Sequence, residues 1–279
     1  MSTIFNIIEE RMPFLRKPIN FFYRKTKYSL KNYFFMLKAS HRKKYKADSF
    51  YEKLLEYKDK HKGSRCFIIA TGPSLTYEDL SLLKGEYTFS MNSICLSYSK
   101  TDFRPTYYGI QDPNVFEKLY PVLFEEYKDS PLFYSVGLEK GKAIPSEWIP
   151  MPVNGLYHMY DYLFTDKRFV KFSNNSYYVI YDGYTITYSL IQLAVYMGFS
   201  TIYLLGCDCN YSDDKNKQHF IETGVFDPSY KTAHDRMIIA YKEAQNYAEK
   251  NGIKIINVTR GGMLDVFPRM KLEDVINGD

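Results

Sequence analysis

Short apolar runs that alternate with helical segments constrain the fold of this chain more than any other feature of its sequence. Apolar runs this short are typical of strands buried on both faces, and the helices between them supply the crossovers that parallel strands need. The sequence therefore predicts a Rossmann-like α/β fold, with a mostly parallel sheet and helices on both faces. We predict strands at 66–70, 87–90, 106–110, 132–135, 177–181, 201–205 and 253–257, and helices that begin near residues 76, 185 and 233.

An uneven distribution of charge separates an N-terminal arm from this α/β region. Residues 1–65 contain 17 Lys or Arg and 6 Asp or Glu, whereas the rest of the chain contains 20 and 26. We predict a basic, amphipathic helical arm at 1–62, with a second helix at 48–61, and a Rossmann-like domain at 63–279. A chain that starts near residue 62 would then fold alone.

The predicted arm helix is apolar on one face and basic around much of the rest. Phe22, Tyr33, Phe34 and Leu37 share the apolar face. A helix of this kind suits the interface of an anionic membrane. We therefore predict that residues 14–46 bind an anionic membrane surface. The alternative is an ordinary helix that packs on the body of the protein or on a partner.

Several classes of protein are disfavoured by what the sequence lacks. The first ten residues do not resemble a signal peptide, and no stretch approaches the roughly 20 apolar residues of a membrane-spanning helix. The cysteines show neither CxxC nor zinc-site spacing, which favours a reducing compartment. We expect a cytoplasmic protein, peripheral on the inner face of the membrane. Since the α/β region is acidic, we expect no nucleic-acid partner; a homo-oligomer is left open.

The segment 71–75, Thr-Gly-Pro-Ser-Leu, has features of a phosphate-binding turn. Gly72 permits a sharp turn, and Pro73 presets the geometry of helix entry. Thr71 and Ser74 supply hydroxyl donors, and backbone N–H groups at the start of the next helix would face an anion. The segment is neither a Walker A loop nor GxGxxG, and a plain tight turn explains it equally well.

Polar residues also follow three other predicted strands. Asn92, Asp112 and Asp208 each come shortly after an apolar run. The carboxyl ends of parallel strands meet at the edge of the sheet where ligands bind. One such residue is usually a helix cap, but three of them, together with the turn at Gly72, predict a shared site.

Two histidines late in the chain are candidates for proton transfer. His219 lies in the polar loop after Asp208, and His234 opens the predicted helix 233–250. Histidine suits general-base chemistry near neutral pH, and the alternative for both is a surface or capping role. Three further histidines are expected at the surface: His41, His61 and His158. Residues 141–176, rich in Pro, Asn, Tyr and charge, are expected to form a long irregular insertion or lid.

These motifs, in this order, resemble two related families. Gly72-Pro73-Ser74-Leu75, then Asn92, then the block 198–208 are similar to the sialyltransferases of glycosyltransferase family 42. They are also similar to the 6-hydroxymethylpterin pyrophosphokinase-like domain, which occurs in motility accessory factor flagellin glycosyltransferases. The run 256–268 resembles the tail of the second family. The resemblance covers about residues 64–270.

The resemblance implies an inverting glycosyltransferase of bacterial surface polysaccharide or glycoprotein synthesis. Its donor would be a CMP-activated nonulosonic acid such as sialic acid, its acceptor a glycan hydroxyl, and no cofactor would be required. His234 would be the general base, and Tyr211 or His219 would assist the departing phosphate. The candidate residues for holding the nucleotide and donor are Thr71, Gly72, Pro73, Ser74, Asn92, Asp112, Thr185 and Asp208.

Two departures from the sialyltransferase pattern leave alternatives open. Ile186-Thr187, beside Thr185, replaces a Ser-Gly pair, and Asp112-Pro113 replaces Asn-Pro. An acid that faces a phosphate is repulsive unless a cation or proton intervenes. The second hypothesis is therefore a magnesium-dependent pyrophosphokinase in which Asp112 and Asp208 hold the metal. The third is a non-catalytic scaffold of polysaccharide assembly, which would bind no nucleotide.

Overall fold

The protein is built on a seven-stranded sheet in which every pair of neighbouring strands is parallel, in the order β5-β4-β3-β2-β1-β8-β9. The strands of this main sheet are β1 (Arg65–Ile69), β2 (Thr88–Met91), β3 (Tyr107–Ile110), β4 (Leu132–Ser135), β5 (Ile149–Met151), β8 (Thr201–Leu205) and β9 (Lys254–Asn257). The computed structural model describes residues 16–45, 49–139, 141–159, 170–210, 218–222, 224 and 230–278. The predicted α/β fold is confirmed.

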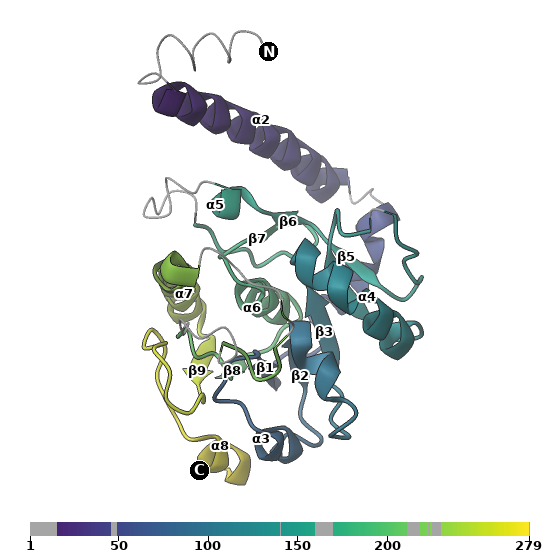
Figure 1. Ribbon diagram of the computed structural model, residues 1–279, viewed down its shortest axis with the longest axis vertical. Helices are drawn as coiled ribbons and strands as arrows, with labels where there is room; N and C mark the ends of the chain where they lie inside the picture. The colour runs from purple at the N-terminus through teal and green to yellow at the C-terminus, as the bar shows by residue number, and fades with distance from the viewer. Residues whose placement is uncertain are drawn as a thin grey trace.

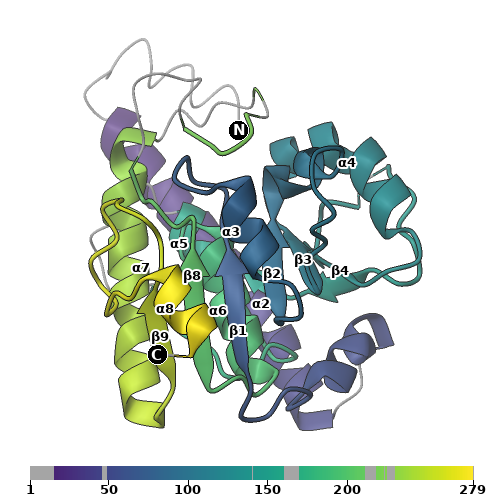
Figure 2. The same ribbon diagram turned by 90° about the horizontal axis from the view of Figure 1, so that it is seen from below.

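Helices cover both faces of the sheet because alternate side chains of each strand point to opposite faces. Cys66 and Ile68 of β1 belong to one buried cluster, and Phe67 and Ile69 belong to another. The first cluster includes residues of α6 and α7, and the second includes residues of α3, η3 and α4. Figure 2 shows α3, α4, α6 and α7 around the sheet. The bounds of these helices are α3 (Tyr77–Leu82), η3 (Asn92–Ser97), α4 (Pro113–Tyr127), α6 (Ile186–Tyr196) and α7 (Tyr230–Asn251).

The strand order places a topological switch beside β1. The chain builds outward from β1 to β5 and then returns to the other side of β1 to form β8 and β9. The loops after β1 and β8 therefore diverge to opposite sides at the carboxyl edge of the sheet. This is the position where open α/β sheets bind their ligands.

The stretch expected to be irregular, 141–176, contains regular structure instead. Its strand β5 forms the edge of the main sheet, and Trp148, which precedes β5, is buried and donates its indole N–H to the Tyr127 carbonyl at 2.8 Å. Strand β5 contains only three residues, one of them a proline, so the sequence pattern did not predict it. Residues 160–169 lie outside the described residues.

A second, two-stranded parallel sheet follows from the same stretch. It pairs β6 (Val153–Asn154) with β7 (Ile180–Tyr181), and β6 leads directly into the short helix α5 (Leu156–Met159). The strand expected at 177–181 is thus reduced to two residues and belongs to this small sheet. The remainder of that segment forms a turn, in which Asn175 accepts the N–H groups of Tyr178 and Val179.

The long helix α2 (Arg16–Tyr45) lies across the body of the protein, next to α5 (Figure 1). Arg42, which is 4 % exposed, donates to the carbonyls of Tyr177 and Tyr178 at 2.7 and 2.6 Å. Its guanidinium also lies 4.4 Å from the centre of the Tyr51 ring. Helix α2 is therefore anchored to the body of the protein. This agrees with the alternative prediction, in which the helix packs on the body.

The segment expected to form a second α-helix at 48–61 is a 3₁₀ helix, η2 (Ser49–Tyr57). Leu54 and Tyr57 from η2 are buried in the first core cluster beneath the sheet. The division of the chain at residue 62 and the independent folding of the chain beyond it both stay predictions, and this packing argues against the second. Within the described part of the chain, no helix combines the length and apolar character needed to cross a membrane.

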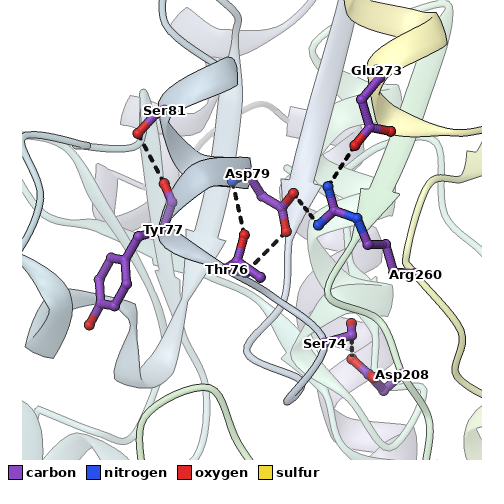
Figure 3. A network of polar contacts seen from close by, with 8 residues as sticks. All are labelled: Ser74, Thr76, Tyr77, Asp79, Ser81, Asp208, Arg260 and Glu273. Carbon is purple, nitrogen blue, oxygen red and sulfur yellow. Dashed lines mark hydrogen bonds and ion pairs between the residues drawn. The ribbon is translucent and has the colours of Figure 1, made fainter.

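A buried carboxylate ties α3 to the C-terminal helix α8 (Leu272–Asn277) (Figure 3). Asp79 and Thr76 form a capping box at the start of α3, and the Asp79 side chain is 1 % exposed. Arg260 forms ion pairs with this carboxylate and, at 2.7 Å, with Glu273 on α8. The guanidinium thus offsets the cost of burying the charge of Asp79.

We expect Arg260→Ala to lower the free energy of unfolding by about 2 kcal/mol, because it leaves a buried acceptor without its partner. Chemical denaturation measures the change. Lys128→Ala is the control, since its partner Glu125 is largely exposed and such pairs contribute at most about 1 kcal/mol. Equal effects of the two substitutions would contradict the assigned role of Arg260.

Candidate functional site

A cleft of about 810 Å³ opens at the carboxyl edge of the main sheet. Its walls come from the turns after β1, β2, β3 and β8, from the segment 182–187, and from one side of α2. The volume lies within the usual range for small-molecule sites. Seven of the predicted donor-binding residues line it, namely Thr71, Gly72, Pro73, Asn92, Asp112, Thr185 and Asp208.

The turns after β1 and β8 fit tightly against each other at the switch point. Gly72 donates its N–H to the Gly206 carbonyl at 2.9 Å, and a Cβ at Gly72 would lie 2.5 Å from that carbonyl oxygen and 2.0 Å from Oδ2 of Asp208. Ser74, the eighth predicted residue, donates its hydroxyl to the same Oδ2 at 2.8 Å (Figure 3). Glycine is therefore required at position 72 by space.

Asp208 is nearly buried at the base of the cleft. Burial raises the pKa of its carboxyl, and the hydrogen bond from Ser74 opposes that shift. Its backbone carbonyl accepts the Met263 N–H at 2.7 Å, so three separate loops meet at this residue. The arrangement holds the acid in one orientation toward the turn at Gly72.

Asn92 has the backbone conformation and the unused polar atom expected of a ligand-binding residue. Its φ is +49°, in the left-handed region, which few residues other than glycine and asparagine adopt readily. The Tyr108 hydroxyl donates to its carbonyl. The side-chain Oδ1 is buried and has no hydrogen-bond partner among the described residues. An unsatisfied buried acceptor beside a cleft is a place where a ligand donor can bind.

Asp112 and Thr185 are helix caps as well as cleft residues. Asp112 Oδ1 accepts the N–H groups of Asn114 and Val115 at 2.7 and 2.9 Å, which caps α4. Thr185 caps α6 by accepting the Thr187 N–H at 3.2 Å. The capping alternative is therefore correct for Asp112, and Thr185 is a cap as well. No group of three His, Cys, Asp or Glu side chains suited to a metal ion occurs among the residues described.

The two late histidines lie in different surroundings. His219 lines the cleft, and the N–H of the next residue, Phe220, donates to the Thr71 carbonyl at 2.8 Å. Burial lowers the pKa of His219, against an opposing effect of Glu222. Helix α7 begins at Tyr230, so His234 stands in its second turn and does not open it, contrary to expectation.

His234 is held through Nδ1, which lies 2.8 Å from the carbonyl oxygen of Cys209. Because a carbonyl only accepts, Nδ1 carries the proton. Among the described residues, His234 is not part of the cleft lining, whereas Cys209, with a φ of +50°, is part of it. Tyr211 lies outside the described residues.

Several cleft residues escaped the sequence-based prediction. Helix α2 contributes Lys31 and Lys38, although its basic side was assigned to a membrane. His158 is 55% exposed, as expected of a surface residue, but it also lines the cleft together with Asp182. Asp182 follows β7 and His158 lies in α5, and the two-residue strand β6 before α5 gives no periodic signal. His61, also expected at the surface, is buried and lies 2.6 Å from the Tyr107 hydroxyl.

Comparison with solved structures shows a distant likeness only. The MAf glycosyltransferase from Magnetospirillum magneticum AMB-1 is 15% identical, with a TM-score of 0.47. The match covers 77% of this chain and 35% of that protein, so the chain spans about a third of its length. No curated protein matches.

A protein-family comparison is more informative. The model described as 6-hydroxymethylpterin diphosphokinase MptE-like matches residues 37–214. The match begins inside α2 and includes η2, whereas the resemblance was expected to begin near residue 64. It covers well over half of the sequence and includes the cleft turns after β1, β2, β3 and β8. The chain therefore belongs to the 6-hydroxymethylpterin diphosphokinase MptE-like family.

Proposed function

We propose that the protein is a glycosyltransferase that takes a sugar from a nucleotide-activated donor. The observation that carries the proposal is the cleft at the switch point, whose lining includes both the turn at Gly72 and Asn92, the residue with the unpartnered Oδ1. A nucleotide phosphate would lie in the cleft beside Thr71, Gly72 and Pro73, with Asn92 accepting a hydrogen bond from the base or ribose. The finer assignment, a CMP-activated nonulosonic acid transferred with inversion, rests on the sialyltransferase resemblance.

A magnesium-dependent diphosphokinase is the second candidate, and the name of the matching family favours it. It would place Asp112 and Asp208 around the metal. Asp208 has the donor chemistry for magnesium, but one of its oxygens already accepts from Ser74, and Asp112 caps α4 through Oδ1. Each acid would have only part of its carboxylate available to the ion.

Nucleotide binding with and without a chelator separates these functions. We expect CMP to stabilise the protein in a thermal-shift panel of CMP, UDP, GDP and ATP, because a ligand at 100 times its dissociation constant adds about 2.7 kcal/mol. EDTA should leave the effect unchanged. Stabilisation by ATP alone, lost with EDTA, would favour the diphosphokinase, and no stabilisation by any nucleotide would favour the scaffold.

Two histidines compete for the role of general base. His234 has the role in the sialyltransferase resemblance, with Tyr211 or His219 assisting the departing phosphate, and these assignments stay predictions. Among the described residues, His158 lines the cleft and His234 does not, so their surroundings distinguish the two.

We also propose that α2 holds the protein on an anionic membrane, close to a lipid-linked acceptor. Helix α2 contains ten Lys or Arg and no Asp or Glu. Leu30, Tyr33, Phe34 and Leu37 are 48–59% exposed. Each basic residue near an anionic surface contributes about 1 kcal/mol, and exposed aromatic side chains enter the interface.

We expect full-length protein to sediment with phosphatidylglycerol vesicles at low salt and to be released at high salt. Phe34→Glu/Leu37→Glu should remove most of this binding. Met263→Glu, at a side chain 53% exposed outside α2, is the control for added charge. Equal loss in both variants, or equal binding to phosphatidylcholine, would refute the assignment to α2.

A further inference from the structure

The small sheet brings a histidine and an acid to one wall of the cleft. Strands β6 and β7 are parallel neighbours, with Asn154 paired to Tyr181. Asp182 directly follows β7, and His158 follows β6 by four residues, in α5. Because the carboxyl ends of neighbouring parallel strands open to the same side, the two side chains meet, and both line the cleft.

The contact between these side chains fixes the orientation of the imidazole. Nδ1 of His158 lies 3.3 Å from Oδ2 of Asp182, and the two side chains are 55% and 4% exposed. A carboxylate accepts, so Nδ1 carries a proton, and in the neutral form of the ring Nε2 is the nitrogen that can accept one. The other oxygen, Oδ1, accepts the Tyr184 N–H at 2.8 Å. The acid is therefore held from both sides.

The turn that carries Asp182 is built under constraint. A Cβ at Gly183 would lie 2.4 Å from the Tyr188 ring, so a side chain does not fit there. Tyr184 has a φ of +68°, which is strained for an aromatic residue. Its ring stacks on the His158 imidazole at 4.5 Å, and the Arg236 guanidinium lies 4.6 Å from the centre of the same Tyr184 ring.

Stability alone does not account for this arrangement. An ion pair with one partner more than half exposed contributes little to stability, whereas a residue held in a strained backbone conformation lowers it. Strain held in a cleft around an oriented imidazole is typical of a catalytic group. His234 is also oriented through Nδ1, by the carbonyl of Cys209, but it is not among the described residues that line the cleft.

We propose that His158 is the proton acceptor of the transfer and that Asp182 is its positioning residue, an inference that rests on the proposed function. Nε2 of His158 takes the proton of the acceptor hydroxyl as its oxygen forms a bond to the anomeric carbon. The bond between that carbon and the donor phosphate oxygen breaks, and the nucleotide leaves with the electron pair. The proton on His158 then passes to solvent. Water can replace the acceptor in the same step.

The test uses full-length protein and measures nucleotide release from CMP-N-acetylneuraminic acid, UDP-N-acetylglucosamine and GDP-mannose, with water as acceptor. His158→Asn keeps a donor where Nδ1 was but has no basic nitrogen. We expect it to lower kcat by about 10²–10⁴-fold, with KM for the donor within about twofold of wild type. Imidazole should restore part of the activity of His158→Ala, an effect that a merely structural role would not show.

The positioning role is measured with Asp182→Asn, which retains an acceptor for the Tyr184 N–H. We expect a smaller loss of kcat with unchanged KM, and loss of the Nδ1-protonated form of His158 in the ¹⁵N spectrum of the imidazole. His234→Asn is the comparison. A His158→Asn enzyme as active as wild type, or a loss confined to His234→Asn, would overturn the proposal. A wild-type protein that releases no nucleotide from any donor would overturn the proposed function, and the role of His158 with it.

Discussion

Removing residues 1–61 is expected to give a chain that does not fold. The deletion takes Leu54 and Tyr57 out of the first core cluster and removes His61, which packs against Phe199. It also removes Arg42, whose guanidinium satisfies two backbone carbonyls. Each large buried side chain contributes about 2–5 kcal/mol, and a domain has only about 5–15 kcal/mol in total. Circular dichroism and size-exclusion chromatography of the shortened chain measure the result.

Single substitutions test the contribution of the N-terminal segment to stability without a deletion. Leu54→Ala should lower the free energy of unfolding by about 2–5 kcal/mol. Leu30→Ala, in α2 but 53% exposed, should change it by about 0.5 kcal/mol or less. A shortened chain that remains folded and binds nucleotide would show that the N-terminal segment is an appendage after all.

Gly72→Ala is expected to reduce donor turnover by roughly 100-fold, since displacement of a binding turn by about 1 Å has effects of that size. The added Cβ would lie 2.0 Å from Oδ2 of Asp208 and 2.5 Å from the Gly206 carbonyl oxygen. Both contacts are far too short, so the turns after β1 and β8 must separate. Nucleotide affinity, measured by titration calorimetry, should fall as well.

Gly85→Ala controls for the general cost of replacing glycine. Gly85 has a φ of +89°, a Cβ added there would have no atom within 4 Å, and the residue is not among those described that line the cleft. We expect it to lower stability by of the order of 1 kcal/mol through backbone strain and to leave nucleotide affinity unchanged. If both variants bind nucleotide as wild type does, the turn at Gly72 is not the phosphate site.

The main sheet could be predicted because each of its long central strands is apolar on both faces. Ile68 and Ile69, for example, enter opposite core clusters, and such continuous apolar runs are the signal of a buried parallel strand. Of the small sheet, β7 lies within the predicted strand 177–181, whereas β6, with two residues, gave no such signal. Edge strand β5 was also missed, since three residues, one of them proline, show no pattern.

The part of the candidate site that follows the main sheet could likewise be predicted, and the part that depends on the small sheet could not. The proximity of Ser74 and Asp208 follows from topology, since both come shortly after neighbouring strands of the main sheet. The pairing of His158 with Asp182 depends on the small sheet and could not be predicted. Lys31 was assigned to the membrane because a helical pattern shows that a side is polar without showing what that side contacts.

The central pair of strands has a consequence for the order of folding. The contact between Ser74 and Asp208 joins residues 134 positions apart, and β1 pairs with β8 over a similar separation. Strands β1 to β5 are complete by residue 151 and can assemble as they leave the ribosome. One edge of β1 stays unpaired until β8 has been synthesised. Closing so long a loop is slow. We therefore expect nucleotide binding to recover late in refolding experiments, and the unpaired edge of β1 to stay exposed until β8 has paired with it.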